Sequence, residues 1–214
     1  MEDRNIATVW IANPPLNQLS RQTRVKLRID LERAIADPIV RVIVLVGHWR
    51  AFSVGADIKE LAQPWPEGGE RAAMDAYVDA YRTHNLAPLA ALIDGSPKPI
   101  VALIHGEAYG GGFELALACQ YRACTPTAQF RFPEVLIGII PGALGTQLLP
   151  RLTSFDISLK MCVGCAPYTA QEALAAGIVD QVLPAVVGDS NTAASYHRRL
   201  LNVLRNQVGL GSPI

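Results

Sequence analysis

The chain has 214 residues, of which 50% are hydrophobic, and its 19 Lys and Arg balance 19 Asp and Glu. This length fits one domain, or a compact core with an appendage, and the apolar content is enough to bury a core, which excludes intrinsic disorder for most of the chain. A formal net charge of zero is not the footprint of a general nucleic-acid binder, and it argues against a nucleic-acid partner.

The apolar stretches are short. The longest, Val42 to Val46 and Val135 to Leu144, fall far below the roughly 18 residues that a membrane span requires. We therefore expect no membrane-spanning helix and no membrane partner. The polar start, MEDRN, shows no secretory or transit signal, so we expect a cytoplasmic protein whose four cysteines are reduced thiols.

Strand-like and helix-like segments alternate over the first two-thirds of the chain, which predicts α/β layers. The turn and cap residues mark where each segment begins and ends. The expected elements are a strand at Ala7–Ile11, a helix from an N-cap at Ser20 through Ala36, a buried strand at Arg41–Val46, a short helix at Asp57–Ala62, a helix at Glu70–Ile93 kinked at Pro88, and a buried strand at Ile100–Ile104.

Helices take over beyond Phe132. A run of glycines after Tyr109 is expected to open a helix that extends to Cys119. The elements predicted beyond it are strands at Tyr121–Thr125 and Ala128–Phe132, helices at Leu144–Leu152, Phe155–Val163 and Thr169–Ala176, a strand at Ile178–Leu183, a polar linker at Gly188–Asn191 and a basic terminal helix.

Three glycine-rich turns could carry chemistry, at Phe52–Asp57, Gly106–Gly112 and Gly138–Gly145. A strand that ends in glycine and opens a helix leaves unpaired N–H groups, which can receive an anion or a developing oxyanion. Each turn could equally be a plain turn, because glycine adopts backbone angles that other residues avoid. The spacing of the second turn does not fit the dinucleotide-binding fingerprint.

Two carboxylates stand in apolar surroundings. Glu114 lies in the run GFELALA, and Glu134 lies between Phe-Pro and Val-Leu. Acids are rarely placed there without a cause, and burial favours their neutral form, so such a pair could divide the roles of general base and general acid. The alternative is that each acid only complements a helix N-terminus.

Several segments together resemble the enoyl-CoA hydratase/isomerase (crotonase) superfamily, and in particular the hydratase/isomerase half of multifunctional fatty-acid oxidation enzymes. The segments are NPPLNQLS (Asn13–Ser20), FSVGADIKE (Phe52–Glu60), GEAYGGGFELALAC (Gly106–Cys119), FPEVLIGIIPGALGTQLLPRL (Phe132–Leu152) and TAQEALAAGIVDQV (Thr169–Val182). The resemblance implies a crotonase-like α/β fold with a β-β-α spiral core over residues 1–143 and a helical C-terminal region over 144–214. It also implies a homotrimer or hexamer.

The resemblance assigns site residues by motif. It places the backbone N–H groups of Ala56 and Gly111 in an oxyanion hole for the thioester oxygen. It implies that Glu114 deprotonates the water that attacks C3 and that Glu134 exchanges the proton at C2. The residues that it places at the coenzyme A and substrate site are Val54, where the family more often has Ala, and Asp57, Ile58 and Gly110.

The expected activity is the addition of water to 2-enoyl-CoA thioesters. It requires no metal or redox cofactor, and coenzyme A enters only as part of the substrate. Two alternatives stay open at this point: isomerisation of a 3-enoyl-CoA to a 2-enoyl-CoA, and a non-catalytic homologue that binds acyl-CoA or RNA.

Other features favour structural roles. Cys162 and Cys165 have the C-x-x-C spacing but no second such pair, so a metal or redox site is not expected. His105 ends a strand and is expected to be a structural histidine.

The arginines at 21, 24 and 28 could line one helix face. A solvated face is expected there, with contact to a coenzyme A phosphate or to RNA as the alternatives. Trp65 and the segment Met74–Tyr81 are expected either to pack in the core or to line an acyl pocket.

Overall fold

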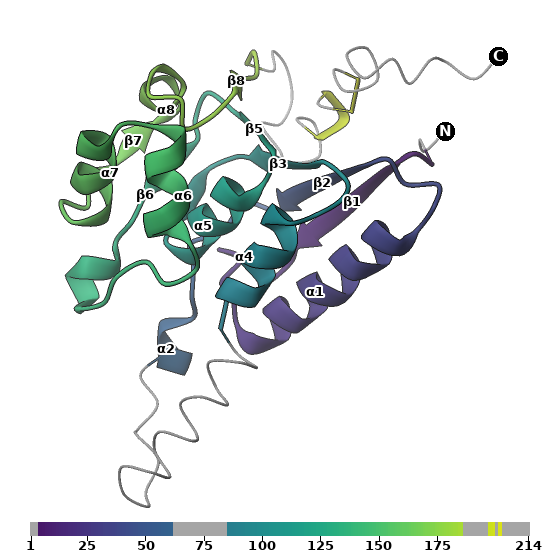
Figure 1. Cartoon of the computed structure of the whole chain (residues 1–214), viewed down its shortest axis with the longest axis horizontal. Coiled ribbons are helices and arrows are strands. Elements are labelled where there is room, and N and C mark those ends of the chain that lie inside the picture. Colours follow the sequence, from purple (N-terminus) through teal and green to yellow (C-terminus); the bar gives the residue numbers. More distant parts are fainter. Residues whose placement is uncertain (1–3, 62–84, 186–196, 200, 203–214) are drawn as a thin grey trace, which may run out of the picture.

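A five-stranded parallel sheet forms the centre of the computed structural model, which describes residues 4–61, 85–185, 197–199 and 201–202 (Figure 1). The strands lie in the order β1 (Ile6–Ile11), β2 (Val42–Gly47), β3 (Ile100–Ile104), β5 (Tyr121–Cys124) and β8 (Gln181–Val182). Every residue of β2 and β3 is buried, as the unbroken apolar runs predict for parallel strands covered on both faces.

Alternate residues of β2 point to the two faces of this sheet. Ile43 and Leu45 belong to the larger core, which includes residues of α1 (Arg21–Ala36), α4 (Ala87–Asp94) and α5 (Gly111–Ala118). Val42, Val44 and Val46 belong to a smaller core on the other face, against which Leu201 packs. Figure 1 shows the three helices side by side on one face of the sheet.

A second sheet contains β4 (Glu107–Tyr109), β6 (Gln129–Arg131) and β7 (Tyr168–Thr169), with β4 parallel and β7 antiparallel to β6. The sequence did not predict β4 or β7. Gly106 and Gly110 flank β4 with positive φ angles, so the sequence around this three-residue strand resembles a turn. β4 pairs with β6, which is distant along the chain. Hydrogen bonds to β6 therefore stabilise a strand that local propensity does not predict.

Short helices complete the fold: α2 (Ile58–Leu61), the 3-10 helix η1 (Glu134–Ile137), α6 (Gly145–Leu152), α7 (Phe155–Cys162) and α8 (Ala170–Ala175). The starts of α6, α7 and α8 lie within one residue of the predicted starts. Ser154 caps α7 by accepting the Ile157 N–H, and Thr169 forms a capping box with Glu172. The sequence did not predict η1, since four residues carry no measurable periodicity.

Ser20 is the predicted N-cap of α1, and its Oγ accepts the Thr23 N–H at 3.3 Å. The expected kink at Pro88 is wrong. Pro88 lies in the first turn of α4, which begins at Ala87, where the missing N–H of proline costs nothing. The rest of the helix expected at Glu70–Ile93, together with Trp65, Met74–Tyr81 and the linker Gly188–Asn191, lies outside the described residues.

The shorter β8 differs from the expected strand at Ile178–Leu183, because only Gln181 and Val182 pair with β5. Of the terminal helix, residues 197–199 and 201–202 are described and helical. Across the described part of the chain, no helix combines the length and the apolar character that crossing a membrane requires.

Candidate active site

A buried asparagine, Asn17, holds the turn from Phe52 to Asp57 through hydrogen bonds. Asn17 has a φ of +54°, and its Nδ2 donates to the carbonyl oxygens of His48 and Ala51 at 2.5 and 2.7 Å. The Ser53 hydroxyl donates to the Asn17 carbonyl at 2.7 Å and accepts the Gly55 N–H at 3.2 Å. The sequence analysis assigned no role to Asn17 or Ser53, although both lie in motifs that it singled out.

Two backbone N–H groups border one small space. A Cβ added to Gly111 would lie 3.9 Å from the Ala56 nitrogen, and a Cβ added to Gly55 would lie 3.1 Å from the Gly111 nitrogen. Neither the Ala56 nor the Gly111 N–H donates a backbone hydrogen bond within the described residues. Gly111 is the first residue of α5, where an N–H has no partner inside the helix. Both donors therefore remain available to an acceptor.

Glu114 lies in the first two turns of α5 and is only 2% exposed. Its Oε1 accepts the backbone N–H groups of Ala143 and Gly145 at 2.7 and 2.8 Å. Leu144 stands between these two donors with a φ of +76°, an angle that lets the N–H groups on either side of it point to one oxygen. Burial raises the pKa of Glu114, and the N–H groups of Gly145, Ala143 and Gly142 counteract the rise.

Glu134 is the first residue of η1 and is 8% exposed. A Cβ added to Gly110 would lie 2.7 Å from Glu134 Oε1, so this carboxylate lies against the backbone next to Gly111. Its Oε2 is buried and has no hydrogen-bond partner within the described residues. Burial, followed by the charge of Glu114, raises the pKa of Glu134 to about 7.

The remaining predicted site residues adjoin these groups. Val54 is half-buried and donates its N–H to the Leu16 carbonyl at 3.1 Å. Asp57 Oδ1 accepts the Lys59 N–H at 3.0 Å and so begins α2. Ile58 is exposed, and Gly110 lies against Glu134. The structure thus brings together Ala56, Gly110, Gly111, Glu114 and Glu134, while Asp57 and Ile58 extend outward from Ala56.

Cys162 at the end of α7 is a neighbour that the sequence analysis did not connect to the site. Burial, together with the charges of Glu134 and Glu114, raises the pKa of its thiol to about 11. The only sequence signal for a position near the glutamates is that Cys162 has apolar neighbours on α7. All four cysteines are free, and in the described segments no three His, Cys, Asp or Glu residues are placed to hold a metal ion.

The three arginines of α1 do not share one solvated face. Arg24 is partly buried and pairs with Glu60 at 3.1 Å, whereas Arg28 forms an exposed pair with Glu32. His105 is buried and its Nε2 donates to the Trp49 carbonyl at 3.0 Å. Burial lowers the pKa of His105, and its Nδ1 has no hydrogen-bond partner within the described residues.

Comparison with known proteins identifies the family to which this chain is similar. Residues 1–208 match the family model described as enoyl-CoA hydratase/isomerase. A peroxisomal bifunctional enzyme of Danio rerio is 41% identical over 179 residues, which are 84% of this chain and 23% of that protein. A probable enoyl-CoA hydratase of Bacillus subtilis (strain 168) is 40% identical over 177 residues, or 83% of this chain and 65% of that protein.

The chain therefore spans less than a quarter of the bifunctional relative and just under two thirds of the bacterial one. The solved structure of an enoyl-CoA hydratase subunit I from Geobacillus kaustophilus HTA426 has a TM-score of 0.78 and 32% identity, and the match covers 95% of this chain and 73% of that one. These similarities confirm the expected crotonase-like α/β fold, and the chain belongs to the enoyl-CoA hydratase/isomerase family.

Proposed function

We propose that this chain is an enoyl-CoA hydratase, which adds water across the C2=C3 bond of a 2-enoyl-CoA thioester. One observation carries the proposal. Around the N-terminus of α5, two buried glutamates meet two backbone N–H groups that no described residue accepts. Such an arrangement offers both proton transfer and stabilisation of a developing negative charge.

The thioester oxygen would accept the N–H groups of Ala56 and Gly111. Attack of water at C3 moves an electron pair onto this oxygen and creates an enolate. A fixed donor aimed at such an oxygen contributes about 2.7–4 kcal/mol to the transition state. The positive end of α5 favours the same charge.

The two glutamates would divide the proton transfers. Glu114, whose carboxylate is stabilised by backbone donors, takes a proton from water as the C3–O bond forms. Glu134, with a pKa of about 7, donates its proton to C2 as the enolate collapses. The product gains one water, and transfer of a proton from Glu114 to Glu134 restores the starting state. Neither proton transfer requires an external oxidant or reductant, and the charge on the thioester oxygen is stabilised by the two backbone N–H groups, so no redox cofactor and no metal is proposed.

The isomerase alternative is less well supported. Moving a proton between C2 and C4 requires one well-placed base, whereas hydration requires a second group that orients and deprotonates water. Glu114 fits this second requirement, since one of its oxygens is fixed by Ala143 and Gly145. For coenzyme A we propose contacts from Val54, Asp57, Ile58 and Gly110, which adjoin Ala56 and Glu134.

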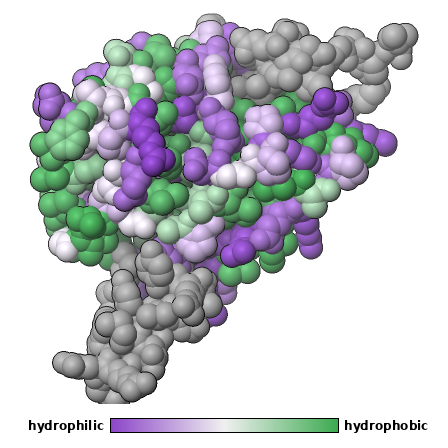
Figure 2. Space-filling model, in the orientation of Figure 1, coloured by the Kyte–Doolittle hydropathy of each residue, from purple (hydrophilic) through white to green (hydrophobic). Residues whose placement is uncertain are grey.

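We also propose that the chain assembles as a homotrimer or hexamer. An apolar stripe runs along α7 to its C-cap, where residues at four-residue spacing are exposed: Phe155, Leu159 and Val163. Leu136 and Ile140 are exposed in and after η1, and Figure 2 shows hydrophobic surface gathered on this side of the molecule. A monomeric mass by light scattering at micromolar concentration would contradict this assembly. A cytoplasmic location is likewise proposed, although several relatives are named peroxisomal.

The deciding experiment is an assay of the purified chain with crotonyl-CoA and with a 3-enoyl-CoA. Hydration of crotonyl-CoA well above the rate in buffer supports the proposal. Rapid isomerisation of the 3-enoyl-CoA without hydration would replace it with the isomerase. Acyl-CoA binding in calorimetry without turnover of either substrate would favour a non-catalytic homologue.

A further inference from the structure

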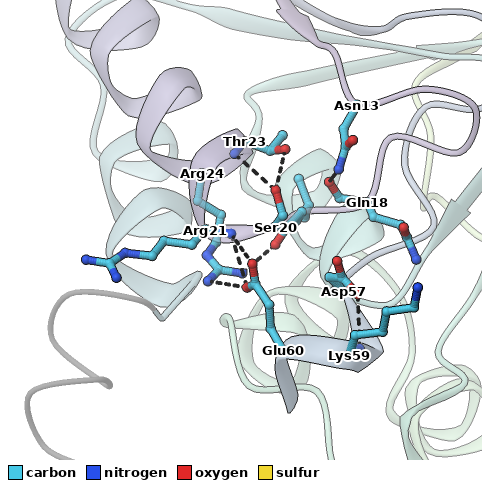
Figure 3. Close-up of polar contacts among 10 residues, drawn as sticks. Asn13, Gln18, Ser20, Arg21, Thr23, Arg24, Asp57, Lys59 and Glu60 are labelled. Atoms are coloured by element: carbon cyan, nitrogen blue, oxygen red, sulfur yellow. Dashed lines mark hydrogen bonds and ion pairs between the residues drawn. The ribbon is translucent and has the colours of Figure 1, made fainter. Parts of the chain in front are cut away.

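The helix α2 follows the proposed oxyanion donor after a single residue. Ala56 is followed by Asp57, whose Oδ1 accepts the Lys59 N–H at 3.0 Å, and Ile58 begins the helix (Figure 3). With four residues, α2 cannot be stable by itself, because helix nucleation is unfavourable. Its position must therefore be fixed by contacts to other elements.

Glu60 provides these contacts by reaching the N-terminus of α1. Its Oε1 and Oε2 accept the Arg21 backbone N–H at 2.8 and 3.1 Å. Its Oε2 also accepts from the Arg24 guanidinium at 3.1 Å. The other arm of that guanidinium donates to the Leu19 carbonyl. Figure 3 shows Arg21, Arg24 and Glu60 converging at the point where α1 begins.

Arg24 is not an ordinary surface arginine. Its side chain is 15% exposed, and its Nε is buried without a hydrogen-bond partner in the described part of the chain. Burying a cation that is incompletely hydrogen-bonded is unfavourable unless an opposite charge compensates. Glu60 supplies that charge. By contrast, Arg28 and Glu32 on the same helix are 57% and 48% exposed, and such pairs contribute little.

The backbone of Ala56 lies between two attachments to the same segment. Before it, the Gly55 carbonyl accepts the Leu19 N–H at 2.8 Å, and Leu19 and Ala56 form a β-bridge. After it, Glu60 binds Arg24, which in turn binds the Leu19 carbonyl. A shift of α2 relative to α1 would therefore turn the Ala56 N–H away from Gly111.

We propose that Arg24 and Glu60 are positioning residues that aim the Ala56 N–H at the thioester oxygen. This inference rests on the proposed function, in which that N–H is one of the two oxyanion donors. An oxyanion donor acts through its position, and a displacement of about 1 Å can cost on the order of a hundredfold in rate. The pair would thus influence kcat without touching the reacting atoms.

The test compares Glu60→Gln with the matched control Glu32→Gln, which removes the carboxylate of the exposed pair on α1. Glutamine at position 60 can still accept the Arg21 N–H but cannot neutralise Arg24. We expect Glu60→Gln to lower kcat for crotonyl-CoA by about tenfold or more with a smaller change in KM, because the lost interaction is stronger in the transition state. We expect Glu32→Gln to leave both constants unchanged.

A second readout follows the donor directly. A chromophoric aryl-conjugated enoyl-CoA absorbs at longer wavelength when its carbonyl accepts hydrogen bonds. The shift on binding should be smaller for Glu60→Gln than for the unmutated chain, and unchanged for Glu32→Gln. Arg24→Lys keeps the charge but cannot reach Leu19 and Glu60 with two arms, so it should reproduce the smaller shift. This variant replaces Glu60→Gln in the test if Glu60→Gln does not fold.

The outcomes separate the two proposals. If the unmutated chain neither hydrates crotonyl-CoA nor shifts the chromophore, the proposed function fails. If it does both, and Glu60→Gln lowers only the melting temperature while kcat and the spectral shift are retained, the pair is merely structural and the inference is overturned.

Discussion

The two buried carboxylates of the site are held in opposite ways. Glu114 projects from a regular helix, and one of its oxygens accepts two backbone N–H groups from the loop before α6. Glu134 begins a single 3-10 turn, and its buried Oε2 has no partner among the described residues. Both lose hydration, but Glu114 accepts three backbone N–H groups from the segment around Leu144, whereas Glu134 is countered only by its own backbone N–H. This difference in compensation is what the proposed division into base and acid rests on.

Removing either carboxylate gives the largest expected effect. Glu114→Gln and Glu134→Gln should each lower kcat for hydration by at least about 10², the scale of lost general acid–base catalysis. Isomerisation distinguishes the two residues: Glu114→Ala should spare some conversion of a 3-enoyl-CoA, whereas Glu134→Ala should abolish both reactions. A variant that folds with an unchanged melting temperature and retains near-normal turnover would disprove the role given to its glutamate.

The next largest effect is expected from displacing the Glu114 carboxylate from its two backbone donors. A Cβ on Gly145 would lie 2.8 Å from both Glu114 Oε1 and Phe132 Cζ. Gly145→Ala should therefore move the carboxylate and lower kcat by about tenfold or more. Gly142→Ala is the matched control, because the nearest atom to its added Cβ is 3.9 Å away and its N–H is kept. Equal kinetics for the two variants would mean that the backbone clamp does not position Glu114.

The burial of Glu134 should be visible in the pH dependence of stability. Its pKa is about 7 in the folded protein against an ordinary value of 4.5, so the folded state binds the proton more tightly. The stabilisation is complete below pH 4.5 and is lost as pH rises through 7, by up to about 3 kcal/mol. Denaturant unfolding of the unmutated chain and of Glu134→Gln between pH 4.5 and 8 measures it. Parallel curves for the two proteins would refute the raised pKa.

The smallest expected effect is on the alkylation rate of Cys162, which reports on the neighbouring charges. Its thiol pKa of about 11 is raised in part by Glu134 and Glu114, and alkylation proceeds through the thiolate. Glu134→Gln should increase the alkylation rate of Cys162 at pH 9 by about threefold, because loss of the neighbouring charge lowers the thiol pKa. The buried Cys119 and Cys124, each with a pKa of about 12, should stay slow in both proteins. Mass spectrometry of the labelled peptides separates the three sites.

The sequence predicts the parts of this molecule whose cause is local. The unbroken apolar run of β2 and the Ser20 cap of α1 are recognisable because burial on two faces and capping each leave a residue pattern. The two glutamates were identifiable because their neighbours are apolar. Their assignment to hydration came from the resemblance rather than from this pattern.

The parts that the sequence did not predict depend on contacts between distant residues. Arg24 and Glu60 are 36 positions apart, and nothing in either neighbourhood marks them as partners. β4 is recognisable only through its pairing with β6 and its bridge to Ser53. Cys162 adjoins the carboxylates because α7 folds back onto the core, which no local pattern reports.

The proposed oxyanion donors are main-chain amides, and this has an evolutionary consequence. No change of codon deletes the N–H of Ala56 or Gly111, apart from replacement by proline, whereas a single base change can remove either glutamate. A lineage that drifted at positions 114 and 134 would thus keep the means to bind and polarise a thioester while it lost the means to add water. The polarised carbonyl would then be open to whatever groups arose around it, so new reactions of thioesters could be acquired without rebuilding the scaffold.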